Sequence, residues 1–132
     1  MMKIMGIDPG TARTGVGIIE GDKRRGFKCV TYLCITTTAN SDMDERLREI
    51  HKVLTKEIKK HRPDVIAVEE LFFNTNPKTV MSVGRAAGAI ILTSSLMGLK
   101  VYEFTPLQVK MAISGYGRAD KTQVQKMIMI LL

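Results

Sequence analysis

The sequence has little cysteine and no long apolar run. Its only cysteines, Cys29 and Cys34, are five positions apart in an expected strand, so at roughly 3.3 Å per residue they lie about 16 Å apart, too far for a disulfide. The longest uncharged stretch, Ala86 to Leu99, contains polar residues and is shorter than the ~20 residues of a membrane span. A basic and apolar leader is also missing. We therefore expect a cytoplasmic protein with reduced core or sheet-face thiols.

Acidic residues are also scarce. Lys and Arg number 20 against 13 Asp and Glu, which gives a net charge of +7. From residue 71 onward, only Glu103 and Asp120 oppose seven basic residues. This half is the expected contact surface for a polyanion such as nucleic acid. A chain of 132 residues is long enough for one domain with a core.

Hydrophobic patterns predict alternating strands and helices, an α/β fold. Strands are expected at 3–8, 15–20 and 27–37, as consecutive antiparallel hairpins, followed by short strands at 64–69 and 100–104. A helix is predicted from Leu47, Ile50, Leu54 and Ile58, with capping acids at 42–45 and terminal cations at 59–62. A second helix spans residues 80–97, where Gly84 and Gly88 would allow another element to approach closely. Further helices are expected after Thr105 and from Asp120 to Leu132.

Two strands of this pattern end on a carboxylate. Asp8 closes the first strand before a Pro-Gly turn, and Glu69 closes the fourth. A helical crossover would make these strands parallel neighbours and bring the carboxylates together. Paired carboxylates repel unless a proton or metal lies between them, and oxygen ligands favour Mg²⁺ or Mn²⁺. A general acid/base pair is a weaker alternative, and Asp8 could instead only hydrogen-bond the turn. His51 and His61 are too far apart in sequence for a typical zinc motif and are expected in solvent.

Three segments carry a family resemblance. They are Ile4-Met5-Gly6-Ile7-Asp8-Pro9-Gly10, Val68-Glu69-Glu70-Leu71-Phe72-Phe73, and the stretch from Gln108-Val109-Lys110 through Gly115-Tyr116-Gly117 to Lys121-Thr122-Gln123-Val124. Together they resemble the RuvC-type Holliday-junction resolvases, a branch of the ribonuclease-H-like nucleases, over essentially the whole chain. The first segment also resembles actin-like ATPases, but those need two large lobes and this chain is too short for them.

The resemblance implies a fold and an activity. The fold would be a ribonuclease-H-like mixed five-stranded sheet, with three antiparallel strands and then two parallel strands, flanked by helices. The activity would be metal-dependent cutting of four-way DNA junctions by a homodimer that works with the RuvA-RuvB branch-migration complex in recombination and repair. Mg²⁺ would be the cofactor, with Mn²⁺ as a substitute and two ions in each complete site.

The same resemblance assigns individual residues. Asp8 and Glu69 correspond to catalytic metal ligands, and Glu70 would lie just behind them. Phe72, Lys110, Lys121 and Arg118 are the expected DNA-binding residues, although Phe72 could instead be a core residue. Arg85 and Ala87 depart from residues common in the family, which leaves the DNA contacts of their helix open.

Family members carry further acidic ligands on a last helix, and this chain has none of them. It ends on an apolar run, Met127 to Leu132, without a helix cap. We therefore expect residues 1–132 to be a single ribonuclease-H-like nuclease domain that lacks the final helix. The alternative is a catalytically incomplete module that only binds junction DNA.

Overall fold

The computed structural model describes residues 1–22, 24–70 and 76–105. In these ranges the elements are β1 (Met2–Asp8), β2 (Arg13–Asp22), β3 (Gly26–Thr36), α1 (Met43–His61), β4 (Val65–Glu69), α2 (Pro77–Leu96) and β5 (Lys100–Phe104). Their order is the predicted one. The helices expected beyond Thr105 lie outside the described residues.

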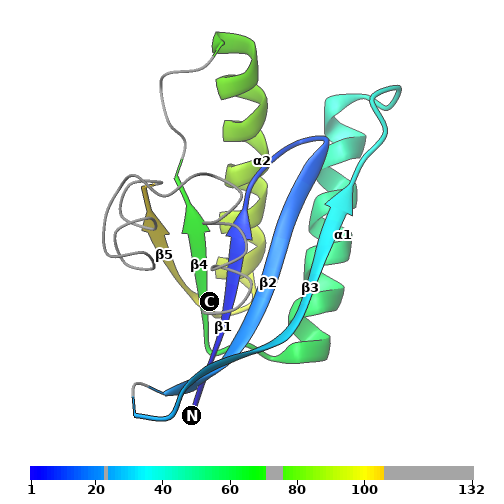
Figure 1. Ribbon diagram of the computed structural model, residues 1–132. Coiled ribbons are helices and arrows are strands. Elements are labelled where there is room, and N and C mark those ends of the chain that lie inside the picture. The colour runs from blue at the N-terminus through cyan, green and yellow to red at the C-terminus, as the bar shows by residue number, and fades with distance from the viewer. Residues whose placement is uncertain (23, 71–75, 106–132) are drawn as a thin grey trace.

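The strands form one mixed sheet in the order β3-β2-β1-β4-β5 (Figure 1). β1 pairs with β2, and β2 with β3, in antiparallel hairpins. β4 runs parallel to both β1 and β5. Helix α2 is the crossover between β4 and β5, whereas α1 connects β3 to β4 and so returns the chain to the place beside β1. The predicted sheet, with three antiparallel strands followed by two parallel ones, is confirmed.

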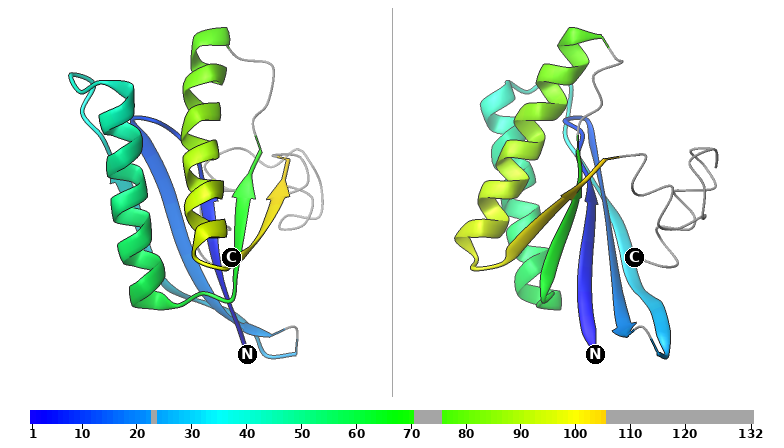
Figure 2. Two further views of the ribbon diagram at one scale, coloured as in Figure 1. Left: turned by 180° about the vertical axis from the view of Figure 1, so that it is seen from behind. Right: turned by 90° about the vertical axis from the view of Figure 1, so that its left-hand side faces the viewer.

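Both helices cover the same face of the sheet (Figure 2). Strand residues alternate between the two faces, so every second side chain of β1, β2 and β4 points into the layer beneath the helices. The core of this layer contains these residues: Met5, Ile7, Val16, Ile18, Ile50, Leu54, Ile66, Val68, Ala86 and Ile90. The apolar strand residues therefore fix which face of the sheet the helices cover. The residues between them in each strand lie on the opposite face.

Helix α1 follows the predicted pattern in its interior but not at its start. Ile50, Leu54 and Ile58 are buried, as their spacing indicates. Asp42 occupies the N-cap position, but its side chain makes no capping hydrogen bond, so the expectation of capping acids is wrong for Asp42. The helix ends at Arg62, whose backbone is left-handed (φ 50°) and whose N–H donates to the Ile58 carbonyl at 2.8 Å.

Helix α2 begins with a side-chain cap, because the backbone N–H of Lys78 donates to the Asn76 side chain at 2.9 Å. Its length and mean hydropathy of 1.3 would suffice to cross a membrane. In this fold, however, α2 packs beside α1 and connects two strands of the sheet, so it is a helix of the domain. Within the part of the chain that the structure describes, a Cβ added at Gly88 would meet no atom within 4 Å, so the expected close approach at this glycine is not made by a described element.

Candidate metal centre

The two predicted carboxylates lie next to each other at the edge of the sheet. β1 and β4 are parallel, and their last paired residues are Ile7 and Val68. Asp8 and Glu69 follow directly and end their strands. The apolar residues of each strand predicted both strand ends, and the helical crossover predicted that the two strands are parallel neighbours, as they are.

Both carboxylates face away from the helices. Ile7 and Val68 are buried in the layer beneath α1 and α2, so by alternation Asp8 and Glu69 lie on the opposite face. Asp8 is exposed and Glu69 is half-buried. Solvent or a large ligand can therefore reach this pair of carboxylates without displacing the core.

The neighbouring strands leave space beside Asp8. Its partner on β2 is Gly15, which has no side chain. A Cβ added at Gly15 would lie 3.7 Å from the Asp8 Cβ, an ordinary van der Waals distance. On the other side, Glu69 pairs with Phe104 of β5, and the Glu70 N–H donates to the Phe104 carbonyl at 2.6 Å. The backbone behind Glu69 is thus fixed, and the surface beside Asp8 stays open.

The turn after Asp8 satisfies its hydrogen bonds without this carboxylate. The Thr14 hydroxyl donates to the Gly10 carbonyl at 2.6 Å and lies 3.4 Å from the Gly10 nitrogen. Within the described ranges, the Asp8 side chain makes no hydrogen bond or ion pair. The alternative in which Asp8 only supports the Pro-Gly turn is therefore wrong for this part of the chain.

Two adjacent, accessible carboxylates fit a hard divalent cation. Mg²⁺ usually keeps several water ligands and is held by one or two carboxylates together with substrate phosphates. Two neighbouring negative charges also repel each other unless a cation or proton lies between them. Residues 1–22, 24–70 and 76–105 contain no group of three or more His, Cys, Asp and Glu side chains placed for a metal. Among the described residues, Asp8 and Glu69 are therefore the pair that could hold such a cation together with water and substrate phosphate.

The histidines have other roles. His51 Nδ1 lies 2.8 Å from the buried Thr93 hydroxyl, and since that hydroxyl donates to the Ala89 carbonyl at 2.7 Å, His51 acts as the donor. His61 lies 3.2 Å from Glu57 on the same helix. The expectation that both histidines lie in solvent holds for His51, which is exposed, but it is wrong for His61, whose side chain is only 15% exposed beside Glu57.

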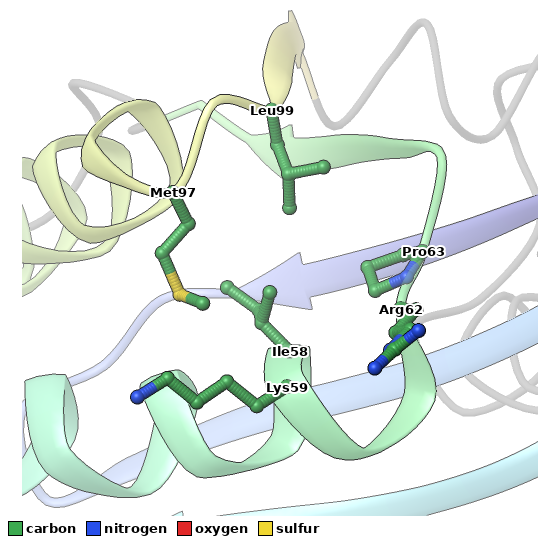
Figure 3. A pocket seen from close by; sticks show the side chains of 6 residues that line it. All are labelled: Ile58, Lys59, Arg62, Pro63, Met97 and Leu99. Atoms are coloured by element: carbon green, nitrogen blue, oxygen red, sulfur yellow. The ribbon is translucent and has the colours of Figure 1, made fainter.

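The predicted DNA-binding residues cannot be placed, because Phe72, Lys110, Arg118 and Lys121 lie outside the described residues. Three cations of the basic second half lie in the described ranges, and the third of them, Lys100, opens β5. Lys78 and Arg85 are exposed on α2, in its N-terminal half. A pocket in the described part of the chain lies elsewhere, at the end of the sheet where β4 and β5 begin (Figure 3), and is lined by Ile58, Lys59, Arg62, Pro63, Met97 and Leu99. That pocket is therefore separate from the carboxylate pair.

Comparison with known proteins identifies the family. The family model described as "Crossover junction endodeoxyribonuclease RuvC" matches residues 4–132. The chain belongs to the RuvC family. A RuvC from Caldicellulosiruptor saccharolyticus is 50% identical over 131 residues, which cover 99% of this chain and 79% of the relative. A RuvC from Desulfitobacterium hafniense is 51% identical over the same shares.

A solved RuvC structure has the same fold. Thermus thermophilus RuvC in complex with a Holliday junction substrate superposes with a TM-score of 0.88 at 31% identity, covering 97% of this chain and 78% of that one. The predicted family and the ribonuclease-H-like fold are thus confirmed. RuvC proteins are metal-dependent nucleases, and this agrees with a site built from carboxylates.

The residues that hold the turn after Asp8 were not predicted from the sequence. Thr11 in this turn is buried and bonds to Ser82 of α2, 71 positions away in the chain. Threonine and serine are common in turns and helices, so neither residue carries a signal in the sequence by itself.

Proposed function

We propose that this chain is the nuclease domain of a crossover junction endodeoxyribonuclease, which resolves four-way (Holliday) DNA junctions in recombination and repair. The observation that carries the proposal is that Asp8 and Glu69 directly follow the last paired residues of two adjacent parallel strands in a RuvC-family sheet. The alternative of a junction-binding module without catalysis is not favoured. The relatives that match 99% of this chain are named as endonucleases.

Asp8 and Glu69 would hold Mg²⁺, with Mn²⁺ as a substitute and two ions in each complete site. When bound, the metal supplies an activated water and stabilises charge on the leaving oxygen of the phosphodiester. The protein contributes position. β1 and β4 hold the two carboxylates side by side, and Gly15 keeps the space beside Asp8 clear of a side chain. The exposure of Asp8 lets a DNA backbone approach from the face opposite the helices.

Cleavage tests the proposal directly. The full-length protein is incubated with a labelled four-way junction and with a linear duplex of the same sequence, in Mg²⁺ or in excess chelator. We expect paired nicks in opposite strands of the junction, only with Mg²⁺, and ends that a ligase can reseal. Equal cutting of the linear duplex, or cutting that persists in chelator, would contradict the proposal.

Symmetric cutting needs two sites related by a two-fold axis, so the active species would be a homodimer. The exposed face of α2 supports this part of the proposal. Met81, Leu92 and Leu96 are 59%, 59% and 72% exposed and lie on one side of the helix, with Gly88 between them. A second copy could approach closely at Gly88 and bury these apolar side chains. The RuvA-RuvB partnership and the cytoplasmic location stay predictions.

A charge on this face is expected to separate the subunits. Leu92→Glu removes an exposed apolar contact and places a carboxylate near its own copy across the axis, so the variant should sediment as a monomer. It should also lose paired cutting while its fold is retained, since Leu92 lies outside the core. Val30→Glu is the matched control, because Val30 is an exposed apolar residue on β3, away from α2. A dimeric Leu92→Glu variant would place the interface elsewhere.

A further inference from the structure

A chain of hydrogen bonds fastens the turn after Asp8 on two sides. The Thr11 hydroxyl donates to the Ser82 carbonyl of α2 at 2.8 Å, and the Ser82 hydroxyl lies 2.5 Å from the Thr11 hydroxyl oxygen. On the other side, the Thr37 hydroxyl donates to the Thr11 carbonyl at 2.6 Å, and Arg46 Nε donates to the Thr37 hydroxyl at 2.8 Å. The turn between β1 and β2 is thus tied to both helices.

Thr11 is buried, and its hydrogen-bond partners Ser82 and Thr37 are half-buried. Thr11 is 5% exposed, although it lies in a turn at the end of the sheet. Water competes weakly for a hydrogen bond at a buried position, and a hydroxyl buried without a partner is unfavourable. The pairing with Ser82 therefore gives this turn one preferred placement on α2.

This placement bears on Asp8, because the turn starts at the residue after it. The Asp8 side chain has no partner among the described residues, so its position depends on the backbone that carries it. β1 holds that backbone on one side, and the turn holds it on the other. Glu69 ends the neighbouring strand, from which the chain continues to α2, the helix that holds Thr11.

We propose that Thr11 is a positioning residue for the metal centre: its buried hydroxyl holds the turn against Ser82 and so fixes the Asp8 carboxylate relative to Glu69. The inference rests on the proposed function, because it takes Asp8 and Glu69 as metal ligands. The hydrogen bonds of Thr11 go to Ser82 and Thr37 and not to either carboxylate. Its effect would be on the position of the Asp8 carboxylate relative to Glu69. Mutation of a residue that orients a metal ligand commonly lowers metal affinity by about 10–100-fold.

The test compares substitutions of similar shape. Thr11→Val keeps the branched side chain and removes the hydroxyl, and Thr11→Ser restores the hydroxyl without the methyl group. Ser94→Ala is the matched control, because Ser94 is buried in α2 and its hydroxyl donates to the Ile90 carbonyl at 2.8 Å, outside the turn. The readouts are Mn²⁺ binding to the DNA-free full-length protein by electron paramagnetic resonance, the Mg²⁺ dependence of junction cleavage, and the melting temperature.

We expect Thr11→Val to raise the Mn²⁺ dissociation constant, and the Mg²⁺ concentration for half-maximal cleavage, by about tenfold. Thr11→Ser should return both values close to those of the parent, and Ser94→Ala should leave both unchanged even where it lowers the melting temperature. If Thr11→Val proves too unstable, Thr37→Val removes the bond on the other side of the turn and should shift both values in the same direction.

Two results would overturn the inference, and they are distinguishable. If Thr11→Val and Ser94→Ala lower the melting temperature alike and neither changes Mn²⁺ binding, the Thr11 hydroxyl only stabilises the fold. If Asp8→Asn leaves Mn²⁺ binding unchanged in the otherwise unaltered protein, the metal-site assignment itself fails, and the positioning role fails with it.

Discussion

Replacing Asp8 by asparagine, or Glu69 by glutamine, is expected to lower junction cleavage by about 10³-fold, since a metal ion contributes several kcal/mol of transition-state stabilisation. Each change deletes one proposed metal ligand and keeps the size of the side chain. Binding of the junction should persist or become tighter, because a negative charge that faces phosphate is removed. Binding is measured by gel shift in chelator, and cleavage by single-turnover nicking in Mg²⁺.

Glu103→Gln is the matched control for these variants. Glu103 is an exposed acid of the same sheet and pairs with Val68, one residue before Glu69, so it lies on the face that the helices cover. The control removes the same charge without touching the carboxylate pair, and cleavage should stay at the parent rate. Parent-like cleavage by Asp8→Asn would show that Asp8 is not a ligand, and equal losses in all three variants would point to overall charge.

The carboxylate pair could be predicted because it depends on short-range rules. Short apolar runs marked the ends of β1 and β4, and the helix before the fourth strand provides the crossover that sets this strand parallel to β1. Together these rules place Asp8 beside Glu69 without knowledge of any side-chain packing. The family resemblance added the chemistry, since two adjacent acids by themselves also allowed a general acid/base pair.

Packing around α2 could not be predicted in the same way. The helix is apolar on most sides, and hydrophobicity does not tell which of its residues face the sheet. The structure buries Thr93 and Ser94 and exposes Leu92 and Leu96. The two buried hydroxyls are satisfied by carbonyl groups one turn earlier in the helix, so a polar residue enters the core at little cost.

Long-range hydrogen bonds were also outside the reach of the sequence. Thr11 and Ser82 are 71 positions apart, and His51 and Thr93 are 42 positions apart. Such pairs depend on how each helix packs against the sheet and against the other helix. The places of Asp8 and Glu69 at the ends of adjacent strands were thus predictable, whereas the residues that hold the turn after Asp8 had to be seen in the structure.

Gly10 lies in the turn that follows Asp8, and we expect that it cannot be replaced. A Cβ at this position would overlap the carbonyl oxygen of Arg13 and lie 3.3 Å from its carbon. Both atoms belong to the backbone where β2 begins, so no side-chain rotation can relieve the contact. Gly10→Ala should therefore lower the free energy of unfolding by about 1–3 kcal/mol, the usual range for overpacking.

Cleavage by Gly10→Ala is expected to fall by about 100-fold, because a displacement of roughly 1 Å at a reacting group can have this effect. Gly15→Ala is the control for stability, since its added Cβ would lie 3.7 Å from the Asp8 Cβ, an ordinary contact, and its melting temperature should match or exceed that of the parent. Unfolding is followed by circular dichroism, and cleavage is measured well below the melting temperature of Gly10→Ala. Parent-like stability and cleavage in that variant would mean that the turn rearranges freely, and the position of Asp8 would then not depend on the turn.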